Sequence, residues 1–199
     1  MNEEHVLVIP AQRLDVLGAF SGFVPFDQAS LDTILDPEHM QFRPRSQVED
    51  DPTFKQLIPY CVLQVGQGDE RRIFQYTRGS GQGEKRLHAK RSVGIGGHIS
   101  REDAAGSDLY RVGMQRELDE EMIIETEISE QLLGFIYDDS TPVGRVHLGV
   151  VHLLQLAAPQ ARARESGLVD SGFVSLAELA AQRDHFEIWS QLCIAQLLG

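Results

Sequence analysis

Residues 94–124 read GIGGHISREDAAGSDLYRVGMQRELDEEMII, and the segment RELDEE at residues 116–121 decides how the whole chain is interpreted. Four of its six residues are acids, and good helix formers lie on both sides. Glu117, Glu120 and Glu121 stand at positions i, i+3 and i+4, so a helix brings their side chains together. Like charges at this spacing destabilise a helix by only about 0.2–0.5 kcal/mol per pair. From these residues alone, a solvated acidic face therefore explains the pattern as well as a functional cluster does.

The glycines before this helix favour a functional cluster. Glycine lets the backbone turn tightly and approach a ligand closely. A strand, a glycine turn and a helix that carries carboxylates suit Mg²⁺, which usually binds one or two carboxylates, water and substrate phosphates. Gly94, Gly96 and Gly97 do not form the GxGxxG motif, and GxxxxGK[ST] does not occur, so neither a dinucleotide-binding nor a P-loop pattern applies.

The composition describes an ordinary globular chain with a strong excess of acids. Its 199 residues suit one domain, or one domain with an extension, and 42% of them are hydrophobic. A formal net charge of −12 argues against a sequence-independent grip on nucleic-acid polymers or anionic membranes, which requires basic surfaces. The N-terminus has no secretory pattern, and no stretch approaches the roughly 18 apolar residues of a membrane span, so we expect a cytoplasmic protein.

The hydrophobic patterns predict a mixed α/β sandwich. We expect strands at residues 5–10, 58–65, 71–78, 133–137 and 145–156, the second and third joined as a hairpin. A helix is expected from about residue 108 to 124, anchored by an apolar stripe of Tyr110, Met114, Leu118 and Met122. A second helix over residues 185–198 should cover one face of the sheet, after a capping box in SLAE at 175–178.

The pattern GG…REUxEE, with U an aliphatic residue, resembles the Nudix box, whose usual form is Gx5Ex7REUxEExGU. The segment RELDEE matches the diagnostic half of this motif. Other segments, GEKRLHAKRSVGIGGHI, GFVSLAEL and FEIWS, resemble a bacterial Nudix subgroup of predicted phosphoesterases. The resemblance implies the Nudix fold, an α+β arrangement with a mixed β-sheet between helices. It also implies a hydrolase domain over residues 56–199, with residues 1–55 as an N-terminal extension packed on it.

The spacing inside the motif departs from the family. From Gly97 to Arg116 there are 19 positions, where the family has about 14, so roughly five residues are inserted. If the family's spacing before Arg116 is kept, Asp108 takes the place of the first box glutamate and the insertion falls around SREDA. Gly113, as the small residue three positions before the arginine, supports this register. Glu102 is the competing candidate.

Ile123 is a second departure, since it stands where the box has a glycine. A β-branched residue resists a positive φ, so we expect the helix to end without the left-handed residue that a glycine would supply.

The resemblance implies a Mg²⁺- or Mn²⁺-dependent pyrophosphohydrolase, in which water attacks a diphosphate linkage in a nucleoside diphosphate joined to another moiety. Glu117, Glu120 and Glu121 would bind the metal, with Glu117 as ligand or base, and Arg116 would orient a glutamate. Glu165, in RARESGLVD, is the candidate for a further metal ligand downstream, and a solvated loop charge is its alternative.

Residues around the glycine turn are candidates for binding the phosphates of a small-molecule diphosphate substrate. They are Arg78, Lys85, Arg86, Gly96, Gly97 and His98. For the basic residues the alternative is a solvated surface charge, and for His98 it is a structural histidine. A homodimer is left open.

Two other functions are compatible with the same fold. An enzyme similar to isopentenyl-diphosphate isomerase would need a catalytic cysteine in its substrate cavity. Cys61 and Cys193 lie in apolar runs, which predicts buried free thiols and speaks against that function. A non-catalytic, ligand-sensing Nudix domain is the other alternative. Such domains typically lose box glutamates, whereas this chain keeps all three, although the missing box glycine leaves the alternative open.

Overall fold

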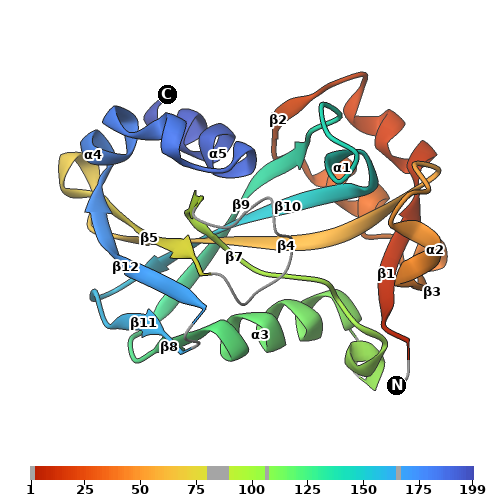
Figure 1. Ribbon diagram of the computed structural model, residues 1–199, viewed down its shortest axis with the longest axis horizontal. Helices are drawn as coiled ribbons and strands as arrows, with labels where there is room; N and C mark the ends of the chain where they lie inside the picture. Colours follow the sequence, from red (N-terminus) through yellow and green to blue (C-terminus); the bar gives the residue numbers. More distant parts are fainter. Residues whose placement is uncertain (1–2, 80–89, 106–107, 165–166) are drawn as a thin grey trace. The chain divides into compact units, whose positions relative to one another are not determined.

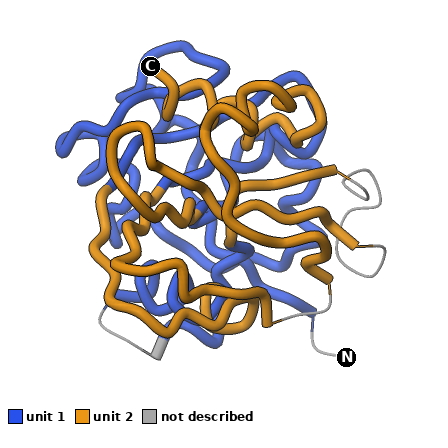
Figure 2. The backbone as a smooth tube through the Cα atoms, turned by 90° about the vertical axis from the view of Figure 1, so that its left-hand side faces the viewer, with its two compact units in different colours: residues 1–60, 96–117, 132–151 blue, residues 61–95, 118–131, 152–199 orange. Residues whose placement is uncertain are grey.

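The computed structural model describes residues 3–79, 90–105, 108–164 and 167–199, and its elements form an α+β fold with a mixed sheet and helices (Figure 1). The chain divides into two compact units. The first contains residues 1–60, 96–117 and 132–151, and the second contains residues 61–95, 118–131 and 152–199 (Figure 2). Three long strands, β4 (Phe54–Val65), β9 (Ile128–Tyr137) and β10 (His147–Leu156), have residues in both units.

The first unit begins with strand β1 (His5–Pro10), which pairs antiparallel with both β3 (Gln41–Pro44) and β4. Strand β2 (Gly22–Pro25) pairs antiparallel with β9, and β10 lies between β9 and β4 in the sheet. The short helices of this unit are α1 (Gln28–Ile34), α2 (Arg45–Val48) and four 3₁₀ helices, at Ala11–Leu17, Pro37–His39, Arg101–Ala105 and Gly144–Val146.

Alternating apolar residues build the core of the first unit. Along β1, Leu7 and Ile9 point to one cluster, where they meet Leu57, Ile99 and Phe135. Val6 and Val8, on the opposite face of the same strand, pack against Val48. This alternation is the period-two pattern of a strand that is buried on both sides. The predicted strand at residues 5–10 is confirmed, and the 3₁₀ helix Ala11–Leu17 follows it.

In the second unit, β5 (Arg72–Arg78) is the central strand and pairs with β4, β6 (Arg91–Ser92) and β12 (Leu168–Ser175). Strand β7 (Gly94–Ile95) pairs with β4, and β8 (Met122–Ile124) with β11 (Ala161–Ala163). Helices α4 (Leu176–Ala181) and α5 (Ile188–Leu198) pack together (Figure 1). The β4–β5 hairpin and the C-terminal helix are confirmed, and so is the capping box, in which Ser175 and Glu178 bond reciprocally.

Helix α3 (Leu109–Glu121) is shorter than the sequence predicted, because residues 122–124 form strand β8. Ile123 pairs with Arg162 of β11 and is extended, and the main-chain N–H of Arg164 donates to the carbonyl of Glu121 at 2.8 Å. The chain therefore leaves the helix by entering a strand, a conformation that a β-branched residue prefers. The expectation that this helix ends without a left-handed residue holds, but the expected helical end at residue 124 was wrong.

This ending predicts that restoring the family glycine weakens the protein. We expect Ile123→Gly to lower the free energy of unfolding by about 1 kcal/mol, because glycine is a poor strand residue and a left-handed cap is not used here. Ile124→Gly, in the same strand at the motif's final aliphatic position, serves as the matched control and should lose a similar amount in urea unfolding. A gain in stability from Ile123→Gly would show that the C-terminal end of α3 is strained when isoleucine replaces the family's glycine.

Candidate active site

Helix α3 carries the acidic segment, and its two ends are fixed by different means. Asp108 precedes the helix, and its Oδ1 accepts a 3.0 Å hydrogen bond from the main-chain N–H of Arg111. This is the geometry of an N-cap aspartate. The predicted apolar stripe is confirmed, since its members are buried to between 2% and 7% relative exposure: Tyr110, Met114, Leu118 and Met122. The stripe anchors one side of the helix and leaves the carboxylates on another.

Asp103 takes the position that the sequence analysis assigned to Asp108 or Glu102. Its carboxylate accepts from Arg116 at both oxygens, with 2.8 Å from Nε to Oδ1 and 3.1 Å from Nη2 to Oδ2. Its side chain is only 2% exposed, and Oδ2 also accepts from the main-chain N–H of Ser100 at 2.7 Å. Glu102 is exposed, and Asp108 caps the helix, so both earlier candidates were wrong.

This contact corrects the register of the motif. Five residues, 98–102, separate Gly97 from Asp103, which is the family's spacing between the glycine and the first acid. Twelve residues, 104–115, then separate Asp103 from Arg116, so the insertion follows the acid instead of preceding it. Gly113 makes the close approach possible. A Cβ on Gly113 would lie 2.9 Å from Oδ2 of Asp103 and 2.6 Å from Cγ2 of Ile99. The small residue is therefore needed for packing against Asp103.

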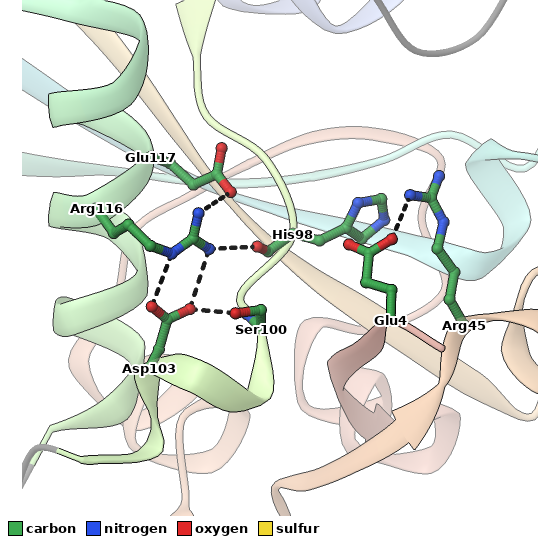
Figure 3. Close-up of polar contacts among 7 residues, drawn as sticks. All are labelled: Glu4, Arg45, His98, Ser100, Asp103, Arg116 and Glu117. Atoms are coloured by element: carbon green, nitrogen blue, oxygen red, sulfur yellow. Dashed lines mark hydrogen bonds and ion pairs between the residues drawn. The ribbon is translucent and has the colours of Figure 1, made fainter. Parts of the chain in front are cut away.

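Arg116 is the centre of the polar network in Figure 3. Besides the two bonds to Asp103, its Nη2 donates to the carbonyl of His98 at 3.0 Å and its Nη1 donates to Oε1 of Glu117 at 2.8 Å. These hydrogen bonds, first of all those to Asp103, raise the pKa of Arg116 above its already high ordinary value, so the guanidinium stays charged. A planar cation held at three sides is a rigid support for a neighbouring carboxylate.

The glycine turn presses directly against Glu117. A Cβ added to Gly97 would lie 2.5 Å from Oε2 of Glu117, and the Glu117 side chain is 15% exposed. Gly96 has φ +148°, and a Cβ there would lie 1.9 Å from the carbonyl oxygen of Pro59. Each glycine is thus required for a distinct reason, the first for room beside the carboxylate and the second for its backbone conformation.

Alanine substitutions should separate these two requirements. Gly97→Ala is expected to weaken Mn²⁺ binding by about tenfold, because the new methyl group displaces the Glu117 carboxylate, a flexible group whose movement leaves the fold intact. Gly96→Ala should instead lower the free energy of unfolding by about 1–3 kcal/mol, because its neighbour is main chain and its φ disfavours a side chain. Thermal unfolding and Mn²⁺ titration of both variants measure the two effects, and a Gly97→Ala protein that binds Mn²⁺ like the original would argue against a role for Glu117.

The three box glutamates lie along α3 with different exposure. Glu117 and Glu121 are half-buried, and Glu120 is exposed. Helical geometry makes Glu117 a neighbour of both other residues. Within the described ranges, no three His, Cys, Asp or Glu side chains converge closely enough to enclose a metal ion. The donors are nonetheless all carboxylate oxygens, which suit a hard cation that keeps several waters and substrate oxygens among its ligands.

The remaining predicted residues fall into two groups. Gly96, Gly97 and His98 form the turn that meets Arg116 and Glu117. Arg78 ends strand β5, where its guanidinium carbon lies 5.8 Å from the centre of the Tyr76 ring. Lys85, Arg86 and Glu165 lie outside the described residues. Asp103 was not predicted as the partner of Arg116, although it is the sixth residue after Gly97, with the family's five residues between them.

The chain is similar over nearly its whole length to known proteins. Protein YmaB of Bacillus subtilis strain 168 is 36% identical over 205 aligned positions, covering 96% of this chain and 96% of that protein. The crystal structure of Tm1382, assigned to the Nudix hydrolases, has a TM-score of 0.81 at 31% identity and covers 98% of each chain. The Nudix domain of NrtR from Shewanella oneidensis, solved with ADP ribose, has a TM-score of 0.51 at 12% identity and covers 87% of this chain and 97% of that one. No protein-family model matches the chain.

The fold, the glycine turn and the acidic helix define a Nudix enzyme. The chain belongs to the Nudix hydrolase family, a family of pyrophosphohydrolases. Within the described parts of the chain, no helix is both long enough and apolar enough to cross a membrane.

Proposed function

We propose that this enzyme hydrolyses the diphosphate linkage of a nucleoside diphosphate joined to another moiety, with Mg²⁺ or Mn²⁺ bound by Glu117, Glu120 and Glu121. The observation that supports the proposal most strongly is the hydrogen bond from Arg116 to Glu117. Nη1 donates to Oε1 at 2.8 Å, while Asp103 and the His98 carbonyl fix the guanidinium. The Glu117 carboxylate is held in one orientation, and the glycine turn beside it has no side chain to block a ligand. This arrangement suits a cation that binds next to a phosphate.

The chemistry divides between the metal and the chain. Bound metal ions would neutralise charge on the phosphoryl oxygens and lower the pKa of a bound water. The chain's part is positional, since Arg116 holds one oxygen of Glu117 and the Gly97 backbone leaves room at the other. Glu117 then serves as ligand or as the base that orients the attacking water, while Glu120 and Glu121 serve as the principal ligands.

Two observations weigh against the alternative functions. Cys61 and Cys193 are buried cysteines that are 1% and 0% exposed, and burial raises the pKa of Cys193 well above its ordinary value. Such thiols are poor candidates for the catalytic cysteine of an isomerase. The retention of all three box glutamates, with Arg116 oriented on one of them, favours catalysis over ligand sensing.

A phosphate-release screen coupled to a phosphomonoesterase tests the proposal, because cleavage of the diphosphate linkage gives two phosphomonoesters and the added phosphatase frees their phosphate. The full chain should be assayed with Mg²⁺ and with Mn²⁺ against nucleotide sugars, dinucleoside polyphosphates, NADH, ADP-ribose, CoA and nucleoside triphosphates. ADP-ribose merits inclusion because the related NrtR domain was solved in complex with it. We expect metal-dependent turnover of at least one diphosphate-linked compound. Specific binding of one compound without turnover under any metal would favour the ligand-sensing alternative.

Several finer assignments stay proposals. We place Glu165 near the metal, and Arg78, Lys85 and Arg86 near the phosphates, on the basis of the sequence. The homodimer, the cytoplasmic location and the role of residues 1–55 as a packed extension also stay predictions.

A further inference from the structure

The ring of His98 faces the ring of His147 in a way that fixes the protons of both. Nε2 of His98 lies 3.1 Å from Nε2 of His147, and the ring centroids are 5.3 Å apart. Nδ1 of His147 lies 2.7 Å from the carbonyl oxygen of Val143. Because a carbonyl only accepts, a neutral His147 carries its proton on Nδ1 and offers Nε2 as an acceptor. With His147 neutral, the proton between the two rings belongs to Nε2 of His98.

The surroundings keep His98 neutral. Burial is the largest cause that lowers the pKa of His98 from 6.5 to about 3, with smaller electrostatic contributions from nearby His147 and Arg45. A neutral ring has one proton, and His98 already donates it to His147. Its other nitrogen, Nδ1, presents a lone pair and can only accept a hydrogen bond. A deprotonated phosphate oxygen is also an acceptor, so the two do not bond. The sequence suggested that His98 binds the phosphates of the substrate. We therefore assign its ring a different role.

His98 links two sides of the glycine turn. Its carbonyl points to Arg116, whereas its side chain extends the other way, toward Glu4 and Arg45 (Figure 3). Two glycines precede it, and glycine places little restraint on the backbone. The ring is then one of the anchors that limit how this segment can rotate, together with the buried Ile99 that follows it. Rotation would move the carbonyl that accepts the 3.0 Å bond from Nη2 of Arg116.

We propose that His147 is a positioning residue in this enzyme. It holds the His98 ring, and through the His98 carbonyl it positions Arg116 and thereby the Glu117 carboxylate. The inference rests on the proposed function in so far as Glu117 is taken to bind metal. Each step is a contact within the first unit: 3.1 Å between the rings, 3.0 Å from Arg116 to the His98 carbonyl and 2.8 Å from Arg116 to Glu117. His147 is the first residue of β10, and its hydrogen bond to the Val143 carbonyl holds its ring in place.

Two substitutions of His147 separate its two hydrogen bonds. Asparagine places its amide where Nδ1 stands, so His147→Asn keeps the bond to Val143 and loses the acceptor for His98. Glutamine reaches the position of Nε2, so His147→Gln offers an oxygen to His98 and loses the bond to Val143. A structural role on β10 predicts that the two variants suffer equally, or that asparagine is the milder change. A positioning role predicts that glutamine is milder.

The most direct readout is the exchange with solvent of the Arg116 Nη2 protons, one of which donates to the His98 carbonyl, followed by NMR in the full-length protein. We expect this exchange to accelerate by about tenfold in His147→Asn and by clearly less in His147→Gln. His152→Asn, which removes another buried histidine of β10, one paired with Glu130 at 2.7 Å, is the control and should leave the exchange unchanged. Equal exchange in the Asn and Gln variants would overturn the inference.

A second readout links the pair to the metal. Mn²⁺ affinity should fall by about three- to tenfold in His147→Asn and recover in His147→Gln, at the lower end of the effect of outer-shell partners. If the unsubstituted protein binds no Mn²⁺, the proposed function fails, while the Arg116 exchange measurement still decides the role of His147. If Mn²⁺ binds and the two variants bind it equally, the inference fails and the proposed function stands.

Discussion

Replacing Glu120 or Glu121 by glutamine is expected to lower metal-dependent turnover by about 10²–10³-fold while the protein stays folded. Each change removes one negative charge and one strong oxygen donor from the acidic face of α3, which carries Glu120 exposed and Glu121 half-buried. Losing a single electrostatic contact to the reacting group typically costs this much in kcat. Turnover measured per folded molecule, with circular dichroism as a check on folding, gives the comparison.

Leu118→Ala provides the control on the same helix. Leu118 is 5% exposed, so its truncation should lower the free energy of unfolding by about 2–5 kcal/mol and leave turnover per folded molecule nearly intact. If all three substitutions reduced turnover per folded molecule equally, the division between ligands and anchor on α3 would be contradicted.

The second large effect is expected at Asp103. Asp103→Ala should lower the free energy of unfolding by about 2–4 kcal/mol, because Arg116 loses its two hydrogen bonds to Asp103 and the missing side chain leaves a buried cavity. Breaking a fully buried ion pair costs somewhat more, about 3–5 kcal/mol, but the Arg116 side chain is 27% exposed. Activity per folded molecule should also fall, since Arg116 then holds Glu117 less firmly.

Asp108→Ala is the matched control, because it removes the acid that the family spacing favoured. It should cost only about 1 kcal/mol, the usual value for losing an N-cap, and leave activity per folded molecule almost unchanged. Urea unfolding and steady-state kinetics of both variants test the register. A larger loss of activity from Asp108→Ala than from Asp103→Ala would return the first-acid role to Asp108.

Much of the fold was predictable because its patterns are local. The strand at residues 5–10 alternates between two clusters, and the capping box in SLAE forms from four consecutive residues. The acidic segment was predictable for the same reason, since helical spacing alone makes Glu117, Glu120 and Glu121 neighbours. The family assignment followed from these local features.

The partner of Arg116 was not predictable in the same way, because it depends on where an insertion is absorbed. Two counts were available, one backward from Arg116 to Asp108 and one forward from Gly97 to Asp103. Only the fold decides that the extra residues follow the acid, with Gly113 small enough to admit Asp103. The end of α3 was missed because Ile123 pairs with Arg162, nearly 40 positions later, a contact that no local pattern indicates. The histidine pair joins residues 49 positions apart for the same reason.

The central claim is that water attacks phosphorus in a metal-dependent reaction, and ¹⁸O labelling tests it most directly. The best substrate from the screen should be turned over with Mg²⁺ in ¹⁸O-enriched water and the products examined by ³¹P NMR. We predict two phosphate-bearing products, one of which carries ¹⁸O on phosphorus, and no turnover when the metal is chelated. Turnover that continues without metal, or products without ¹⁸O on any phosphorus, would contradict the account.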